Sequence, residues 1–377
     1  MFGKPIELFR VFGFAIRIDP SWFIVAILVT WSFTRSFPVW APGLTPAAYL
    51  GMGVTAAIGY FLSVVLHELS HALVARTYGM EMRGITLFIF GGVAEMPGEP
   101  PTPQAEFLVA AAGPAASFAI ALIFGAGYLA ANVAGSPVPV AAVFGLLGLL
   151  NATLALFNLA PAFPLDGGRM LRAVLWGWSG SLRRATRISS GIGSGFGLLL
   201  VGLGVLATVR GNLVSGLWLF LLGLFVRNAA QASYQQLLLR RALEGEPVSR
   251  FMQTDPVTVP RAICVLDLVQ SYVYKHHHKM FPVVDDGGRL LGCVTTRQVR
   301  ELPRDEWDRQ TVGSLAERCT PENTVAADTD AMQALAMMSR TGASRLMVVD
   351  GDRLLGILAL KDLLRFFSLK MELEEAG

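Results

Sequence analysis

The chain has 377 residues, of which 53% are hydrophobic and only 16% are charged, whereas soluble proteins carry about 25% charged residues. Its net charge of +3 does not indicate a nucleic-acid partner, and its three cysteines, without CxxC spacing, exclude a secreted disulfide scaffold. The charges are also uneven, with 22 in residues 1–240 and 37 in residues 241–377. This division predicts a transmembrane domain over 1–240 and a soluble domain over 241–377.

Six apolar segments in the first domain are close to the ~20 residues that a helix needs to cross the core of a bilayer. The expected spans are residues 20–36, 51–75, 106–132, 139–160, 188–208 and 213–229. Arginines follow the fourth and the sixth span, and the positive-inside rule places such loops in the cytoplasm. We therefore expect a multi-pass protein of the cell membrane whose two termini and soluble domain are all cytoplasmic.

Two segments of the transmembrane domain do not have the pattern of a spanning helix. Residues 6–18 alternate between apolar and polar side chains and predict a short hairpin. The run ITLFIF at 85–90 resembles a strand, and a non-helical backbone at membrane depth must be satisfied by protein or a water-filled cavity. The predicted fold class is a polytopic α-helical membrane protein with about six transmembrane helices, a small membrane-embedded β-hairpin or sheet, and a C-terminal α/β module.

The C-terminal module contains an internal repeat. The segment FPVVDDGGRLLGCVTTRQV at 281–299 recurs as LMVVDGDRLLGILALKDL at 346–363. Each copy follows a predicted helix and a short Pro- or Thr-rich strand. The pattern predicts two β-α-β-β-α units, at about 246–302 and 311–368, that pack as one pseudo-symmetric α/β module.

The second span contains the sequence HELSH at residues 67–71. On a helix, His67 and His71 are one turn apart, so both imidazoles can bind one zinc ion, and Glu68 can take a proton from a zinc-activated water. The alternative is a His/Glu cluster that is merely hydrogen-bonded inside a helix bundle. Ionisable groups in an apolar span are costly and mark function by default, which favours the zinc site.

A catalytic zinc site needs a third protein ligand, and the few carboxylates of this domain make Asp166 the candidate. Asp166 lies in NLAPAFPLDGGR, where prolines and glycines unwind the end of the fourth span; the alternative is an ordinary turn aspartate. Asn158, eight residues earlier, can donate a hydrogen bond to a substrate carbonyl or a developing oxyanion. A plain helix–helix hydrogen bond is the alternative for Asn158.

Four segments together resemble the site-2 protease family of intramembrane zinc metalloproteases. They are HELSH, FGGVAEM, PQAEFLVAAAGPAAS and NLAPAFPLDGGR, and the CBS-like repeats narrow the resemblance to the prokaryotic branch with C-terminal CBS domains. The resemblance implies that His67, His71 and Asp166 bind one catalytic Zn²⁺ per chain and that Glu68 is the catalytic base. It also implies that Asn158 helps to hold the substrate.

The same resemblance implies a reaction and a class of partner. The chain would be an intramembrane zinc endopeptidase that cleaves a single-pass or multi-pass membrane protein in or near a transmembrane helix. FGGVAEM would belong to a sheet that presents the unwound substrate as an added strand. Asp19 stands where members of the family often have histidine, and we assign it no catalytic role.

The two repeats resemble CBS domains, which implies binding of an adenine nucleotide such as ATP or AMP between paired copies. Each repeat keeps half of the motif G-h-h-T/S-x-x-D: the first has Thr295 but Gln298, and the second has Asp362 but Ala359. Thr295 and Asp362 are therefore the candidate nucleotide ligands. The alternative is a purely structural module that pairs two chains in a homodimer.

Two other functions, transport and metal or pH sensing, have weaker support in the sequence. A CBS-regulated transporter or channel without proteolytic activity would need a polar path across the bundle, and the spans show almost none outside HELSH and the Asp166 region. The histidine run 276–278 resembles a metal patch, but its position between a helix and a strand favours a solvent-facing turn over a metal or pH sensor. The sequence therefore favours a protease.

Overall fold

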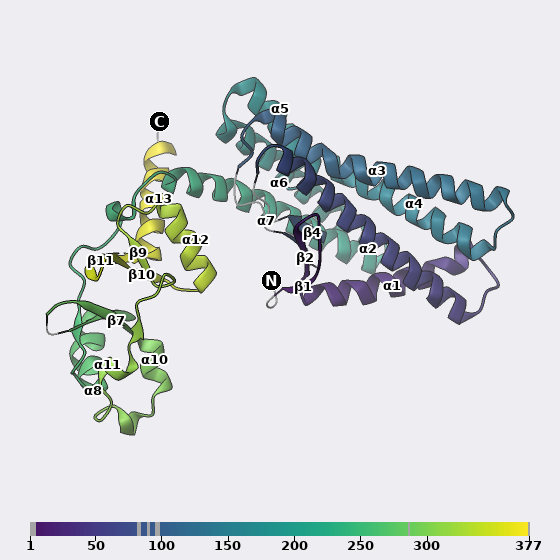
Figure 1. The fold of residues 1–377 in the computed structure, drawn as a ribbon. Coiled ribbons are helices and arrows are strands. Elements are labelled where there is room, and N and C mark those ends of the chain that lie inside the picture. The colour runs from purple at the N-terminus through teal and green to yellow at the C-terminus, as the bar shows by residue number, and fades with distance from the viewer. Residues whose placement is uncertain (1–4, 81–83, 89–90, 95–98, 286, 376–377) are drawn as a thin grey trace. The chain divides into compact units, whose positions relative to one another are not determined.

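The computed structural model describes residues 5–80, 84–88, 91–94, 99–285 and 287–375. It divides into two compact units, Met1–Gln235 and Gln236–Gly377 (Figure 1). The division falls five residues before the boundary that the change in charge density predicts.

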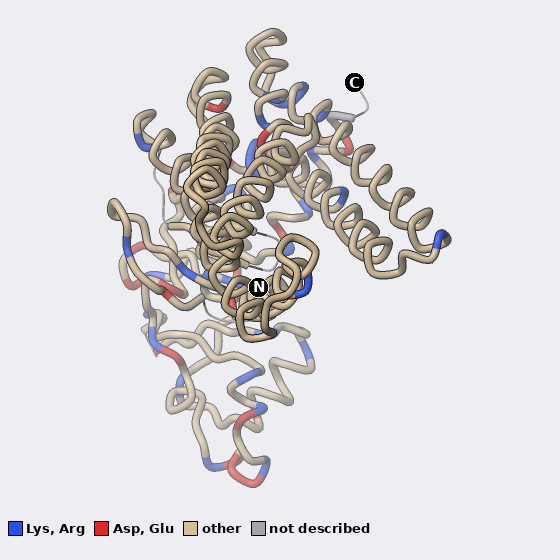
Figure 2. The backbone as a smooth tube through the Cα atoms, turned by 90° about the vertical axis from the view of Figure 1, so that its right-hand side faces the viewer, with Lys and Arg blue, Asp and Glu red and all other residues tan. Residues whose placement is uncertain are grey.

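Among the described residues, six helices are long and apolar enough to cross a membrane, which confirms the predicted number of spans. They are α1 (Ser21–Trp40), α2 (Pro46–Thr77), α3 (Pro103–Val133), α4 (Val138–Asn158), α6 (Leu182–Val209) and α7 (Leu213–Leu243). In Figure 2 the long helices are tan over most of their length, which means that few of their residues are charged. The chain is therefore a multi-pass membrane protein.

Local sequence signals fix where the two central helices begin. Thr45 caps α2 and accepts a hydrogen bond from Ala48 N at 3.3 Å, while Thr102 caps α3 and accepts one from Ala105 N at 3.1 Å. In both helices the cap is followed by proline, whose missing N–H costs nothing in the first turn. These caps lengthen both helices beyond the predicted spans at their N-terminal ends.

Helix α7 extends beyond residue 229, where the predicted sixth span ends, and continues to Leu243. Polar residues such as Gln231 and Gln235 end the apolar stretch but not the helix, since they are good helix formers. The first strong break is Gly245, whose φ of +82° favours glycine. The last turns of α7 belong to the second unit, where Leu243 is fully buried.

A four-stranded sheet packs against α2. Its strands are β1 (Ile6–Val11), β2 (Phe14–Ile18), β3 (Ile85–Phe88) and β4 (Gly91–Ala94), and they follow this order across the sheet. β1 and β2 form the predicted hairpin over residues 6–18. β3 lies in the strand-like run ITLFIF and β4 in FGGVAEM, and the two form a second hairpin of the predicted small sheet. Residues 89, 90, 95 and 96 of that second prediction lie outside the described residues.

The segment between α4 and the next helix turns sharply on itself. Helix α5 (Asp166–Ser179) begins at Asp166, and added Cβ atoms at Gly167 and Gly168 would lie only 2.2 Å from the Leu159 carbonyl oxygen and from Phe163 N. Only glycine permits this close backbone approach. The helix α5 itself was not predicted, because the sequence reading treats this stretch as a loop between spans.

The second unit consists of two similar halves. The first has strands β5 (Val259–Pro260), β6 (Met280–Val284), β7 (Leu290–Thr295) and β8 (Glu317–Arg318), and the second has β9 (Thr324–Ala326), β10 (Arg345–Asp350) and β11 (Arg353–Ala359). In both halves a parallel strand pair is joined to an antiparallel one, as the internal repeat predicts. Short helices complete the halves: η1 (Val248–Arg250), α8 (Val265–Asp267), η2 (Leu268–Val273), α9 (Tyr274–His276), α10 (Thr296–Glu301), η3 (Arg304–Glu306), α11 (Val312–Leu315), α12 (Ala331–Thr341) and α13 (Leu360–Glu375).

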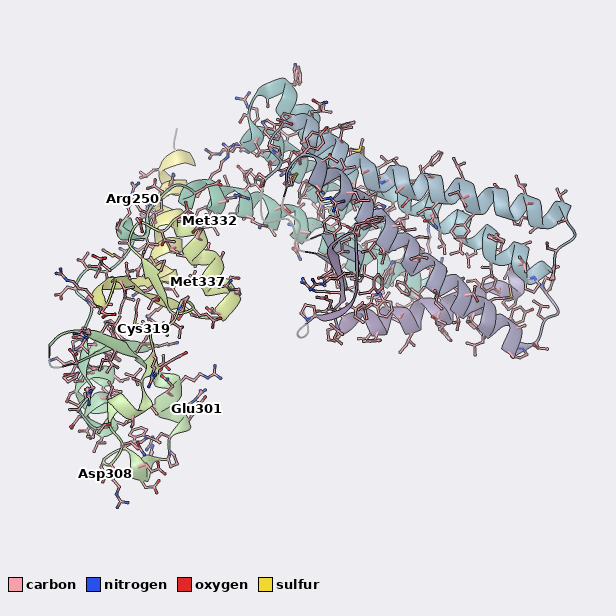
Figure 3. The ribbon with its side chains drawn as sticks, viewed as in Figure 1. Arg250, Glu301, Asp308, Cys319, Met332 and Met337 are labelled. Carbon is pink, nitrogen blue, oxygen red and sulfur yellow. The ribbon has the colours of Figure 1, made fainter. Side chains whose placement is uncertain are left out.

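Separate apolar clusters lie in the two halves of this unit. Figure 3 labels Met332 and Met337 on α12, which pack against the core of the second half around Leu346 and Leu358. Arg250, also labelled, pairs with Glu246 at 2.6 Å and lies over the ring of Phe366. This α/β architecture and the six apolar helices confirm the predicted fold class.

Candidate metal centre

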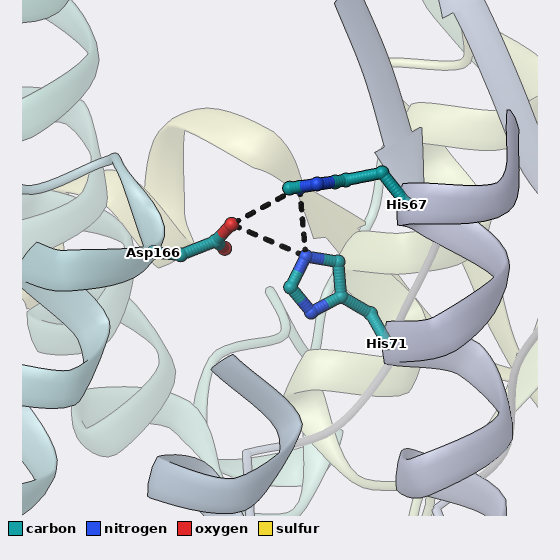
Figure 4. Close-up of side chains that lie close together, drawn as sticks. All are labelled: His67, His71 and Asp166. Atoms are coloured by element: carbon teal, nitrogen blue, oxygen red, sulfur yellow. Dashed lines mark hydrogen bonds and ion pairs between the residues drawn. The ribbon is translucent and has the colours of Figure 1, made fainter. Parts of the chain in front are cut away.

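Helix α2 presents His67 and His71 on one face, one turn apart, and both side chains are buried. Their Nε2 atoms lie 3.2 Å from each other (Figure 4). Each Nε2 also lies 3.2 Å from Oδ2 of Asp166, the first residue of α5, which is buried as well. The fold therefore brings together three potential ligands, of which His67 and Asp166 are 99 residues apart in the sequence.

The second ring nitrogens of both histidines are held by α3. His71 Nδ1 donates to the Val109 carbonyl oxygen at 2.6 Å, and His67 Nδ1 lies 2.9 Å from Ser117 Oγ. Because a carbonyl only accepts hydrogen bonds, the proton of His71 sits on Nδ1, and Nε2 directs its lone pair to the centre. Such outer partners orient the imidazoles of metal sites.

A glycine of α3 leaves the space beside the two rings open. A Cβ atom at Gly113 would lie 2.1 Å from His71 Nε2 and 2.6 Å from His67 Nε2, far inside van der Waals contact. Any other residue at this position would fill the space where an ion must sit. The open space beside the two imidazole rings therefore depends on glycine at position 113.

The donor set and its spacing fit zinc. Bonds of about 2.0–2.1 Å in a tetrahedron separate neighbouring ligand atoms by about 3.3 Å, and the three donors here are 3.2 Å apart. Two imidazole nitrogens and one carboxylate oxygen occupy one triangular face, so the fourth position stays open for water or substrate. Among the described residues this is the one group of three or more His, Cys, Asp or Glu side chains that could hold a metal.

Glu68 lies next to this triangle on α2 and contacts the sheet. An added Cβ atom at Gly92 of β4 would lie 2.5 Å from Glu68 Cγ and 2.9 Å from Glu68 Oε1. The strand therefore passes directly over the carboxylate, which a side chain at residue 92 would displace. The structure brings Glu68 of the HELSH motif to the edge strand of the sheet.

Asn158 is the last residue of α4, and its Nδ2 donates to the Leu154 carbonyl oxygen at 3.0 Å within the same helix. The hydrogen bond between helices is made instead by Asn151, whose Nδ2 donates to Ser63 Oγ at 3.1 Å. Asp19 is buried and its Oδ1 accepts from Ser21 N at 2.9 Å, at the start of α1. It lies outside the group of three metal-ligating side chains.

The two candidate nucleotide ligands occupy different local environments. Thr295 caps α10: its Oγ1 accepts from Gln298 N, and the Gln298 side chain accepts from Thr295 N at 2.7 Å. This capping box satisfies both residues within the helix start. In the second repeat Asp362 of α13 takes the place of Gln298, and its Oδ2 is buried without a hydrogen-bond partner among the described residues.

The histidine run and the cysteines give no second metal centre among the described residues. The rings of His276 and His278 are stacked with centroids 6.1 Å apart. The pKa of His278 is lowered mainly by burial and, to a smaller extent, by the positive charge of Arg345. Burial raises the pKa of the Cys293 thiol to about 11, so it is inert at neutral pH.

Comparison with known proteins identifies the family. The model of peptidase family M50 matches residues 55–138 and 129–201, and the CBS domain model matches 248–305 and 312–369. Rip3 of Mycobacterium tuberculosis is 35% identical over 363 residues, which cover 96% of this chain and 92% of that protein. The chain belongs to peptidase family M50.

A second curated relative of this M50 peptidase matches it over nearly its whole length, and a solved structure matches part of it. The zinc metalloprotease MJ0392 of Methanocaldococcus jannaschii is 30% identical over 373 residues, or 98% of each chain. A solved site-2 protease from the same organism is 31% identical and covers 61% of this chain and 94% of its own, with a TM-score of 0.42. The predicted family and the predicted zinc metalloprotease activity are confirmed, and the substrates of this family are membrane proteins.

The sequence reading missed the residues that surround the ligands. Val109 acts through its backbone carbonyl, which carries no residue signature, and Gly113 acts through the side chain that it lacks. Ser117 belongs to the quoted segment PQAEFLVAAAGPAAS, and a hydroxyl on the same helical face as Gly113 was the available signal.

Proposed function

We propose that His67, His71 and Asp166 hold one catalytic zinc ion and that Glu68 is the general base of peptide hydrolysis. The observation that carries this proposal is the triangle of three donor atoms 3.2 Å apart beside the opening left by Gly113. A zinc ion held by these three residues would supply Lewis-acid chemistry, which would polarise the scissile carbonyl and lower the pKa of water towards ~7. Glu68 takes the proton of the attacking water and passes it to the leaving amine.

The substrate is a transmembrane segment of a partner membrane protein that has unwound, because a helical peptide bond is shielded by its own hydrogen bonds. β4 is an edge strand of the sheet, and its Gly92 lies against Glu68. An unwound segment can add to this edge through backbone hydrogen bonds, which places its peptide bonds beside the general base. This arrangement requires little of the substrate's side chains.

Asn158 is proposed to donate to a carbonyl of the bound substrate. Its place at the end of α4, where the chain turns towards Asp166, supports this role. In the free protein its amide donates to Leu154, so binding would exchange a bond within the helix for one to the substrate.

The arginines define the proposed orientation in the membrane. Arg169, Arg172 and the arginines at the start of α6 lie on the side of the membrane where α5 connects two spans, and the exit of α7 carries Arg240 and Arg241. By the positive-inside rule this side faces the cytoplasm. Both termini and the CBS unit would then be cytoplasmic, and a cleaved regulator would be released there.

For the CBS unit we propose regulation by an adenine nucleotide that binds through Asp362. Its Oδ2 is a buried acceptor without a partner among the described residues, which a ribose hydroxyl would satisfy. The hydroxyl of Thr295 is engaged in its capping box, so we expect Thr295 to contribute less to nucleotide binding than Asp362. Pairing of the CBS units of two chains in a homodimer remains part of the proposal.

The proteolytic role is tested with full-length protein reconstituted in liposomes with a tagged single-pass substrate. Wild-type protein should cleave the substrate, and Glu68→Gln should reduce the cleavage rate about 10²–10⁴-fold while it retains one zinc per chain. Membership of the M50 family favours this activity over transport. Cleavage by Glu68→Gln at the wild-type rate would refute the assigned base.

A further inference from the structure

One face of α3 contacts both histidines of the metal centre and the helix that begins with Asp166. Glu106, Val109, Gly113 and Ser117 recur at intervals of three and four residues, which places them on a single helical face. Three of them act on the histidines: Val109 and Ser117 hold the Nδ1 atoms, and Gly113 leaves the opening. The fourth residue, Glu106, does not touch either histidine, and the mechanism above does not use it.

Glu106 connects this face to the helix that begins with the third ligand. Its side chain is fully buried, and its Oε1 accepts a hydrogen bond from Arg172 Nε at 2.5 Å and forms an ion pair with Arg172 Nη2. Arg172 lies on α5, six residues after Asp166, and its side chain is also buried. The contact therefore joins two helices through residues 66 positions apart.

Arg172 also contacts the segment just before Asp166. Its guanidinium lies over the ring of Phe163, with Cζ 5.2 Å from the ring centroid, and Phe163 precedes Asp166 by three residues. Glu99 Oε2 lies 3.7 Å from Arg172 Nη2. Arg172 thus connects Glu106 of α3 with the segment that leads into the carboxylate ligand.

We propose that Glu106 and Arg172 form a positioning pair that sets Asp166 at bonding distance from the metal that His67 and His71 share. The inference rests on the proposed metal centre and adds two residues to it. α3 then fixes all three ligands, the histidines directly and Asp166 through Arg172. Stabilisation alone is a poor reason for the pair, because buried ion pairs lose about as much in desolvation as they gain in attraction.

The test measures metal binding by full-length protein in detergent, independently of proteolysis. Zinc affinity is measured by competition with a chromophoric chelator, and the ligand geometry is read from the visible spectrum of the Co²⁺-substituted protein. Glu106→Gln should raise the zinc Kd about 10–100-fold and change the cobalt spectrum, since residues that orient ligands have effects of this size. Glu7→Gln is the matched control, because Glu7 is also paired with an arginine in this unit but is exposed, and it should leave both readouts unchanged.

A second variant covers the case in which Glu106→Gln fails to fold because Arg172 is left unpaired. Glu106→Gln/Arg172→Met removes both charges and should fold, yet it should still bind zinc about tenfold or more weakly. Zinc affinities and cobalt spectra equal to those of the wild type in both variants, with only a lower thermal midpoint, would overturn the inference. A wild-type chain that binds no zinc would refute the metal centre itself, and the positioning role with it.

Discussion

In the membrane unit, the ligand atoms of His67, His71 and Asp166 lie 3.2 Å apart, and both remaining histidine nitrogens have a partner on α3. In the C-terminal unit, the hydroxyl and the carboxylate of one motif are divided between two repeats. The first repeat keeps Thr295, which serves as a helix cap, and the second keeps Asp362, whose Oδ2 is buried without a partner among the described residues.

This difference has a physical cause. An unpartnered polar group in an apolar bundle costs a few kcal/mol, so the loss of one member of the metal centre leaves the others at a penalty. In the first repeat the residue that remains is satisfied locally, because Thr295 and Gln298 form a capping box. In the second repeat Asp362 Oδ2 is buried without a partner among the described residues, so the two halves of the motif differ in their environment.

The largest expected effect follows from removing a ligand. His71→Ala or Asp166→Ala leaves two donors, which do not make a closed zinc site, so both zinc and proteolysis should be lost. Zinc per folded chain is measured by atomic emission after gel filtration. Asp19→Asn is the control, since it alters another buried carboxylate of the same unit and should keep one zinc per chain. Full zinc content in Asp166→Ala would show that the third ligand is wrong.

A change that adds a single methyl group tests the opening beside the histidines. Gly113→Ala should strongly weaken zinc binding, because its Cβ would lie 2.1 Å from His71 Nε2. Gly125→Ala in the same helix has nothing within 4 Å of the new Cβ and should bind zinc like the wild type. Competition with a chelator measures both affinities. Equal affinities in the two variants would contradict the assigned ion position.

The comparison between the repeats is sharpened by nucleotide titration of the full-length protein. Asp362→Ala should weaken ATP or AMP binding about tenfold or more, because a charged acceptor for the ribose is lost. Gln298→Ala should leave the affinity unchanged, since Gln298 serves the helix cap. Calorimetry gives both values. The absence of binding to the wild-type protein would reject the nucleotide proposal.

The smallest expected effect concerns the cap of the first repeat. Thr295→Ala should lower the unfolding free energy of the C-terminal unit by about 1 kcal/mol, because α10 loses its N-terminal cap. Thr295→Ser keeps the hydroxyl and should retain most of the stability. Denaturant melts monitored by circular dichroism measure the difference. If serine failed to restore stability, the methyl group rather than the cap would be the cause.

Much of the site is evident from the sequence because its residue types are rare in this domain. Two histidines one turn apart in an apolar helix leave few interpretations, and few carboxylates compete with Asp166 for the third position. The number of spans and the hairpin at 6–18 follow from hydropathy and alternation. These features depend on local pattern, which a single sequence displays.

The remainder depends on contacts between distant segments or on atoms that all residues share. The Val109 carbonyl, the opening at Gly113 and the Glu106–Arg172 pair have no local signature. The extension of α7 to Leu243 was missed because hydropathy reports where a span leaves the membrane rather than where its helix ends. Helix α5 was missed because it is too short and too polar to be a span.

The most direct test of the metal centre is X-ray absorption at the zinc edge of the purified full-length protein. The geometry predicts two imidazole nitrogens at about 2.0–2.1 Å and carboxylate and water oxygens at about 2.0–2.2 Å, with no sulfur. A zinc–sulfur shell at about 2.3 Å would contradict it, because the chain's three cysteines, Cys264, Cys293 and Cys319, all lie in the C-terminal unit.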